Sequence, residues 1–267
     1  MGVAAIRARE SRRADRLFVD PYAQAFLDAA PSVLPAEPGD LAALGPLGAM
    51  FSYLGVIRTR FFDDYLLAAV AGDCRQVVLL AAGLDTRAFR LAWPDGVRLF
   101  EVDFPAVLSF KDQALARQAT VPVPRCTRKI VAADLRANWQ ADLVEAGFEH
   151  TVPTAWLAEG LLIYLSAGDA ARLLTSVGEL STAGSRLAFE HVTIADTTVV
   201  LTQARTMPAM DEWTALWKGG LGQDAPEWLA SRGWTTHTHD SATLGTSYGR
   251  AAPAQLSGGF LTALRTR

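Results

Sequence analysis

The sequence predicts an α/β protein built on a doubly wound, mostly parallel sheet of seven strands. Short apolar runs alternate with helical patterns from residue 76 to the C-terminus, which is typical of β-α-β units. Half of the 267 residues are hydrophobic and only 20% are charged, so the chain can form a sizeable core. Acidic or small residues follow four successive runs, as expected where strands end at a ligand. The expected strands are 76–82, 97–102, 129–133, 155–158, 185–190, 234–239 and 259–264.

The residues before the first strand are expected to form a helical, proline-punctuated lid. A helix is expected over 14–29, around Asp20-Pro21, and a loop over 31–35. A segment of this kind either covers a site or pads the sheet, and the sequence favours neither. The chain is expected to be one domain, 1–267, with four parts: the lid (1–57), a core (58–191), a cap (192–224) and the last strands (225–267).

A helix is predicted over 58–71, because its apolar residues recur on one face and Gly72 is placed to end it. Arg58 and Arg60 would stand at its start. Cations there oppose the helix dipole, which favours a functional role for them over a purely solvated one.

Two later helices have recognisable starts. Ser166 and Asp169 form the pattern of a capping box, and Asp224 before Pro226 fits a capped first turn. The expected helices after the first strand are 105–118, 138–147, 167–180, 207–218 and 225–232.

The segment 192–224 separates the fifth strand from the next helix. Met207, Met210, Trp213 and Trp217 have helical spacing there, which fits either a substrate cover or a packed core.

Composition limits the partners. A net charge of −3 gives no basic excess for a phosphate backbone, so nucleic acid is not expected. The apolar stretch 41–57 is interrupted by glycine and proline and is too short to span a bilayer, so no membrane is expected. Cys74 and Cys126 lack C-x-x-C spacing, which argues against a metal site or disulfide framework and fits the cytoplasm. No pattern indicates an oligomeric state.

The first two strands carry the most informative spacing. The run 76–82 ends at Gly83, and the second strand ends in Asp103, 20 positions later. In β-α-β units an acid at this place binds the ribose of a nucleoside. The loop has one glycine rather than the three of G-x-G-x-x-G, so it fits a nucleoside without phosphates, such as S-adenosylmethionine.

Three further strand ends add candidate contacts for such a cofactor. Small residues at Ala81 and Ala82 would allow close approach to the backbone. Asp134 follows the third strand and could accept from an adenine amino group, and Glu159 follows the fourth and could face an ammonium or sulfonium. A single carboxylate after a strand is usually a helix cap or a solvated turn, but four strand ends of this kind favour a binding site.

Several segments together form a specific pattern: Arg7 to Tyr22, Arg58 to Asp64, Gln76 to Leu91, Phe100 to Pro105 with Lys111, Ala133 to Arg136 with Trp139, and Pro153 to Leu165. These segments resemble the leucine carboxyl methyltransferase family, in particular its bacterial branch with actinobacterial O-methyltransferases. The resemblance covers about residues 5 to 190. It implies a class I, Rossmann-like methyltransferase dependent on S-adenosyl-L-methionine.

The resemblance also implies roles for single residues. Arg58 would pair with the cofactor's carboxylate, and one basic residue of the N-terminal segment, Arg9, Arg12 or Arg13, would help it. The other implied cofactor contacts are Gly83 in the loop, Asp103 at the ribose, Asp134 and Leu135 at the adenine, and Glu159 at the methionine moiety.

One position departs from the family pattern. The family loop usually reads Gly-Ala-Gly, whereas this chain has Ala81-Ala82-Gly83. Alanine is the smallest replacement and is expected to adopt ordinary backbone angles at Ala81, so binding should be retained with some loss of affinity.

The expected reaction is methylation of a carboxylate or hydroxyl of a small molecule, such as a polyketide-type secondary metabolite. A carboxylate acceptor needs no base, whereas a hydroxyl benefits from one, for which His191 and Tyr164 are the candidates. Two alternatives remain: a noncatalytic S-adenosylmethionine-binding protein, and an NAD-dependent oxidoreductase, which the missing glycines disfavour.

Overall fold

The seven predicted strands form one sheet. The computed structural model describes residues 1–30, 45–191, 215–253 and 258–266. The strand order is β3-β2-β1-β4-β5-β7-β6, and only β7 runs antiparallel to its neighbours. This confirms the mostly parallel sheet. The strands are β1 Gln76–Leu80, β2 Arg98–Asp103, β3 Thr127–Ala132, β4 Thr154–Ala158, β5 Arg186–His191, β6 Trp234–Asp240 and β7 Gly259–Arg265.

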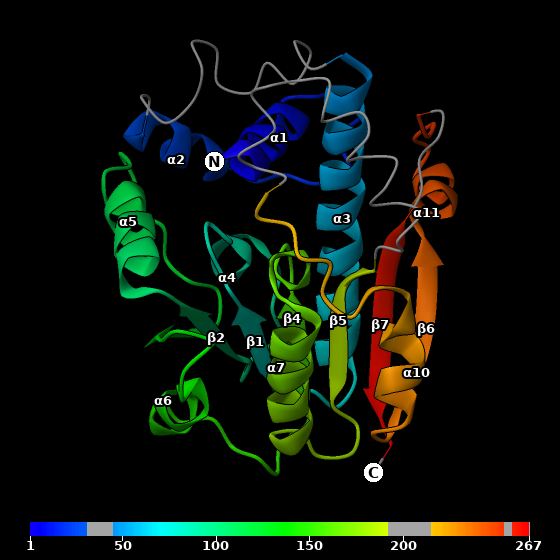
Figure 1. The fold of residues 1–267 in the computed structure, drawn as a ribbon. Helices are drawn as coiled ribbons and strands as arrows, with labels where there is room; N and C mark the ends of the chain where they lie inside the picture. The colour runs from blue at the N-terminus through cyan, green and yellow to red at the C-terminus, as the bar shows by residue number, and fades with distance from the viewer. Residues whose placement is uncertain (31–44, 192–214, 254–257, 267) are drawn as a thin grey trace.

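Helices cover both faces of the sheet, so the sheet is doubly wound (Figure 1). One hydrophobic cluster joins β1 and β4 to α3, α5 and the N-terminal helices, through residues such as Leu79, Phe62 and Leu115. The other joins the opposite face to α6, α7 and α10, through residues such as Trp156 and Leu173. The described α-helices and 3-10 helices (η) after β1 are α4 Arg87–Arg90, α5 Pro105–Ala116, α6 Trp139–Glu145, η3 Leu162–Tyr164, α7 Ala167–Glu179, η5 Gly222–Asp224, α10 Ala225–Ala230 and α11 Ser241–Ser247.

The predicted helix over 14–29 is wrong in its first half. The structure has α1 Gly2–Ser11 and a short α2 Ala23–Ala29. Proline lacks an amide hydrogen and disfavours a helical residue before it, so a helix does not continue through Asp20-Pro21. The Asp20 carboxylate instead accepts the N–H groups of Tyr22 and Ala23, both at 3.1 Å, at the start of α2.

The helix predicted to begin at Arg58 begins much earlier. Helix α3 runs from Gly45 to Ala71, and Gly72 follows it as predicted. Gly55 lies within the continuous α3 and allows close packing, since a Cβ there would lie 2.8 Å from Ile6 Cδ1 of α1. Arg58 therefore lies in the middle of a helix, and the argument from the dipole at a helix start does not apply. The expected division at 57/58 falls inside this continuous helix.

The two predicted helix starts have different outcomes. The hydroxyl of Ser166 accepts the N–H of Asp169 at 3.1 Å, which confirms the capping box of α7. Asp224 occupies the N-cap position of α10, as predicted, but its side chain makes no capping hydrogen bond. The predicted cap is therefore wrong. Most of the helix predicted over 207–218, with Met207, Met210 and Trp213, lies outside the described residues.

Within the described parts of the chain, no helix is long and apolar enough to cross a membrane.

Candidate functional site

The carboxyl ends of β1 and β2 meet at Asp103. One Asp103 carboxylate oxygen accepts the N–H of Gly83 at 2.6 Å, and the other accepts the N–H of Phe104 at 2.7 Å. Asp103 is only 8% exposed. The carboxylate is therefore fixed in direction, and each oxygen keeps acceptor capacity for a ligand hydroxyl.

The loop after β1 is shaped by two residues with left-handed backbone angles. Gly83 has a φ of 50°, and a Cβ there would meet only Ala81 O, at 3.8 Å, so the space above it is open. Ala81 has a φ of 54° and is the one non-glycine residue with positive φ among the described residues. The expectation of ordinary backbone angles at Ala81 is therefore wrong: the loop holds this alanine in a conformation that favours glycine.

The strain at Ala81 gives a testable stability difference. Ala81→Gly should raise the free energy of unfolding by roughly 1 kcal/mol, because the left-handed conformation disfavours a Cβ. Urea unfolding at unchanged m-value measures it. The neighbouring Ala82→Gly is the matched control and should lower the free energy by at least about 0.5 kcal/mol, since Ala82 has no positive φ to relieve. If both variants lost the same free energy of unfolding, the backbone of Ala81 would not be strained.

A group of three side chains, here called the Arg58 cluster, joins α3 to the ends of β4 and β5. Arg58 Nε lies 3.0 Å from Glu159 Oε1, and Arg58 Nη1 donates to Glu190 Oε1 at 3.0 Å. Glu190 also accepts the N–H of Gly160 at 2.8 Å. The Arg58, Glu159 and Glu190 side chains remain 17–20% exposed, so this cluster can contact a ligand.

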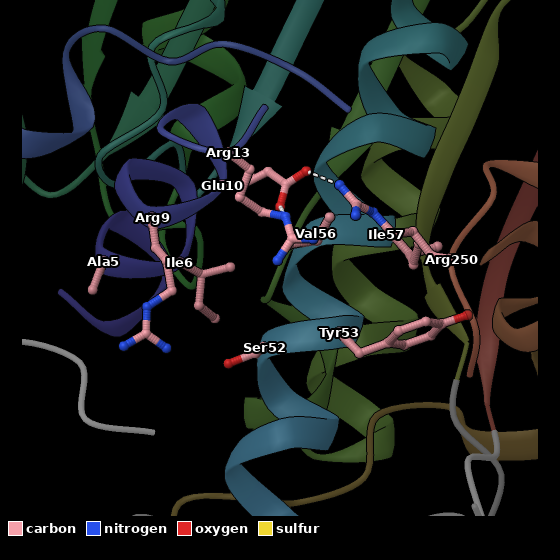
Figure 2. Close-up of a pocket in the computed structure, with 10 residues that line it drawn as sticks. All are labelled: Ala5, Ile6, Arg9, Glu10, Arg13, Ser52, Tyr53, Val56, Ile57 and Arg250. Atoms are coloured by element: carbon pink, nitrogen blue, oxygen red, sulfur yellow. Dashed lines mark hydrogen bonds and ion pairs between the residues drawn. The ribbon is translucent and has the colours of Figure 1, made fainter. Parts of the chain in front are cut away.

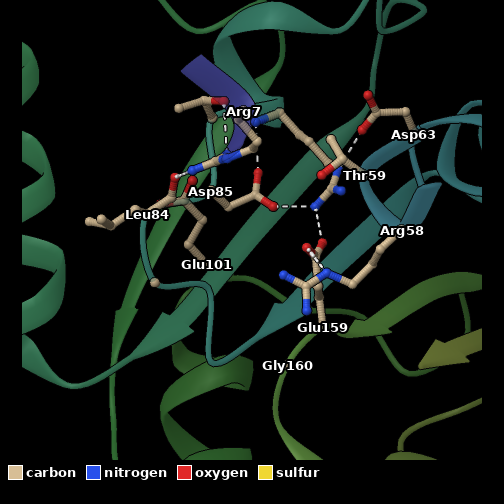
Figure 3. Close-up of polar contacts among 12 residues, drawn as sticks. Arg7, Arg58, Thr59, Asp63, Leu84, Asp85, Glu101, Glu159 and Gly160 are labelled. Carbon is tan, nitrogen blue, oxygen red and sulfur yellow. Dashed lines mark hydrogen bonds and ion pairs between the residues drawn. The ribbon is translucent and has the colours of Figure 1, made fainter. Parts of the chain in front are cut away.

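A second group, the Arg87 cluster, lies behind the first and is closed to solvent. It consists of Arg87, Arg90, Asp63 and Asp85, whose side chains are 3–9% exposed. Arg87 donates to Asp63 at 2.7 Å, pairs with Asp85, and reaches Glu159 of the Arg58 cluster at 2.7 Å. Figure 3 shows Asp63, Asp85 and Glu159 converging from α3, the loop after β1 and the end of β4. The ion pairs thus tie the loop to the strand ends.

The two carboxylates that share Arg58 differ in their electrostatics. Burial raises the pKa of Glu159, but Arg87 and Arg58 outweigh it, so the pKa lies below the usual value. Burial also raises the pKa of Glu190, and there the attraction of Arg58 does not compensate, since Glu159 adds repulsion. Glu190 is therefore the less firmly ionised of the two.

The N-terminal cation that contacts the loop is Arg7, not one of the expected candidates Arg9, Arg12 and Arg13. Arg7 donates to Leu84 O at 2.7 Å (Figure 3). It also pairs with Asp20 at 3.1 Å. Arg12 instead donates to Gln24 on the surface. Arg7 pairs with Asp20, which lies in the turn before α2. The expected helix over 14–29 gives no sign of this turn.

Arg9 and Arg13 line a different cavity, of about 270 Å³, between α1 and α3. Figure 2 shows Arg9 on α1 facing the Ser52 and Tyr53 side of α3, with Arg250 paired to Glu10 at 2.7 Å. The lining of this cavity shares no residue with the strand-end site.

The end of β3 is more open than the other strand ends. Asp134 pairs with Arg136 at 2.7 Å, and its side chain is 31% exposed. The Arg136 guanidinium lies over the ring of Phe104, which is 46% exposed directly after Asp103. Leu135 packs against the second hydrophobic cluster. An aromatic ring and an acid are thus available beside Asp103.

The two candidate bases are placed differently. Tyr164 ends η3, and burial raises its pKa, with Arg58 and Glu190 among the charges that act on it. The hydroxyl therefore keeps its proton at neutral pH. His191 ends β5 directly after Glu190, and successive strand residues point to opposite faces. Since Glu190 reaches Arg58 on the α3 side, His191 points towards the other face.

The seven-stranded sheet is the fold of class I methyltransferases, and the family and relatives described next show that the protein is a methyltransferase that depends on S-adenosylmethionine. The sequence profile of the leucine carboxyl methyltransferase family matches residues 1–178, and the chain belongs to that family. A Parafrankia protein, provisionally named an S-adenosylmethionine-dependent methyltransferase, is 51% identical over 99% of this chain and 86% of its own length.

Other relatives agree with this assignment. A Frankia alni protein with the same provisional name is 49% identical over 99% of this chain and 92% of its own. Among solved structures, a DUF574 family protein from Streptomyces avermitilis is similar with a TM-score of 0.61 and 17% identity, over 99% of this chain and 97% of that one. At that identity the likeness concerns the fold alone.

Proposed function

We propose that the protein transfers a methyl group from S-adenosylmethionine to an oxygen of a small molecule, a carboxylate or a hydroxyl. The observation that carries the proposal is the arrangement of Asp103 beside an open glycine loop, with the partly exposed Arg58 cluster at the neighbouring strand ends. An acid, an open backbone and a mixed-charge cluster match the ribose and the charged methionine end of this cofactor.

The residues fit the cofactor by their chemistry. Asp103 would accept the ribose hydroxyls, with Gly83 leaving room above the loop. Arg58 would take the cofactor's carboxylate, since its side chain remains 17% exposed at the strand ends. Glu159 would take the ammonium group. Asp134 and Leu135, with Phe104, would hold the adenine.

The cofactor supplies an activated methyl group, and the protein's part is mainly to position the acceptor and exclude water. A carboxylate acceptor is ionised at neutral pH and needs no base, whereas a phenol has a pKa of about 10. The protonated Tyr164 and the direction of His191 support a carboxylate acceptor, while a hydroxyl stays within the proposal. The single loop glycine disfavours the NAD-dependent alternative. A cytoplasmic location and a role in secondary metabolism are parts of the proposal that the sequence alone suggests.

Transfer to an oxygen acceptor can be tested by incubating the protein with S-adenosylmethionine and a panel of small carboxylic acids and phenols, with mass spectrometry of the products. A carboxylate acceptor should give a rate nearly independent of pH above about 6, because its pKa is near 4. A phenol should give a rate that rises with pH. Cofactor binding without methylation of any acceptor would favour the noncatalytic alternative.

A further inference from the structure

The Arg58 cluster carries one uncompensated negative charge. One guanidinium, Arg58, faces two carboxylates, Glu159 and Glu190. The Arg87 cluster behind it is balanced, with two arginines against Asp63 and Asp85. The excess charge therefore lies at the end that remains 17–20% exposed, where a ligand can reach it.

The proposed cofactor has the complementary charge. The methionine end of S-adenosylmethionine carries a carboxylate, an ammonium and a sulfonium, so its net charge is one positive. When the methyl group is transferred, the S–C bond breaks, its electron pair stays on sulfur, and the product S-adenosylhomocysteine is neutral at that end. The cluster would then be neutralised by the substrate form and left negative by the product form.

We propose that Glu190 is the residue by which the site distinguishes the cationic cofactor from its neutral product, and that Glu190 takes up a proton when the product is bound. This inference rests on the proposed function. Glu159 is a weaker candidate because two arginines, Arg58 and Arg87, hold it in the ionised form.

The surroundings of Glu190 support this assignment. Arg58 faces it from α3, and Glu159 and the Gly160 N–H face it from the end of β4. Tyr164 of η3 is near enough for the charge of Glu190 to raise the pKa of Tyr164. Its partner across the ladder on β7 is Phe260, which carries no charge. Since burial already raises the pKa of Glu190, the loss of a nearby positive charge favours its protonation.

The test is calorimetric binding of three ligands to the full chain near neutral pH, in phosphate and in Tris, whose ionisation enthalpies differ. The ligands are S-adenosylmethionine, S-adenosylhomocysteine and sinefungin, in which an amine-bearing carbon replaces the methylsulfonium. Binding of S-adenosylhomocysteine should be accompanied by the uptake of more protons by the protein than binding of either cationic ligand. This measurement uses the unmodified protein and does not depend on a variant.

Glu190→Gln should remove that difference in proton uptake. It should also lower the preference for sinefungin over S-adenosylhomocysteine by about tenfold, which corresponds to 1.4 kcal/mol. Glutamine keeps an oxygen that can accept from Gly160 and Arg58, and circular dichroism checks its fold. Glu145→Gln, which removes the same charge from the exposed side of α6, should leave both quantities unchanged.

The outcomes separate the two proposals. If all three ligands bind but proton uptake is equal in the unmodified protein, or the preference survives Glu190→Gln, the assignment of Glu190 is wrong while the cofactor stands. If none of the ligands binds, the proposed function fails, and the assignment of Glu190 fails with it.

Discussion

Replacing Arg87 with methionine should lower the free energy of unfolding by about 3–5 kcal/mol, because it leaves buried carboxylates without their cation. Arg87 is 2% exposed and pairs with Asp63, Asp85 and Glu159. Methionine fills similar volume, so the loss reports the charge rather than a cavity. Urea unfolding near neutral pH measures it.

The pH dependence gives a second signature of the same residue. Arg87 is the first of the charges that lower the pKa of Asp85 and Glu159 against the effect of burial. Their stabilising contribution is full above the unfolded pKa of about 4 and is lost as the pH falls through the lowered folded values. In the methionine variant this loss on acidification should disappear, because the stranded carboxylates favour the protonated form.

An exposed ion pair serves as the control for Arg87. Arg172 pairs with Asp169 on α7, and its side chain is 76% exposed. Arg172→Met should change the free energy of unfolding by less than about 1 kcal/mol. A similarly small effect at Arg87 would mean that the buried cluster contributes little to the fold.

Asp103→Asn should weaken S-adenosylmethionine binding by about 100-fold, the loss expected from two charge-assisted hydrogen bonds to ribose hydroxyls. The amide keeps only one acceptor oxygen, whereas the carboxylate uses both oxygens on the N–H groups of Gly83 and Phe104. Calorimetric titration measures the affinity, and thermal unfolding without ligand shows whether the fold is kept.

The control for Asp103 is Asp95→Asn, which removes the same charge from an exposed turn before β2. The Asp95→Asn variant should bind S-adenosylmethionine with the affinity of the unmodified protein. Equal affinity in both variants would place the ribose elsewhere and would remove the main support for the strand-end site.

The strands and their ends could be predicted because their signals are local. Each core strand is a short apolar run bounded by polar or small residues, and the parallel order follows from the helices between the runs. Parallel strands bring their carboxyl ends to one edge, so Gly83 and Asp103 could be expected together, and their 2.6 Å hydrogen bond agrees with that. The family resemblance directed attention to Arg58 and Glu159, which the structure pairs at 3.0 Å.

Other features had only weak local signals. Glu190 has only one signal in the sequence: strand alternation places either Glu190 or its neighbour His191 on the face towards α3, without deciding which. Arg87 lies in the segment Asp85-Thr86-Arg87 after the loop, where the family resemblance implies no separate role for it. Its three carboxylate partners come from separate elements, so their convergence had no signal in the local sequence.

The sequence by itself determined the mostly parallel sheet, the places of its strands along the chain and the acids at their ends, because these depend on patterns within a few residues. The tertiary structure alone decided the length of α3, the positive φ of Ala81 and the contact of Arg7 with the loop after β1. Each of these depends on contacts between distant segments: Ile6 packs against Gly55, and Arg7 reaches Leu84 across 77 positions. A local pattern states what a segment prefers, but the pairing of distant charges and the backbone angles of a loop are set when the segments pack together.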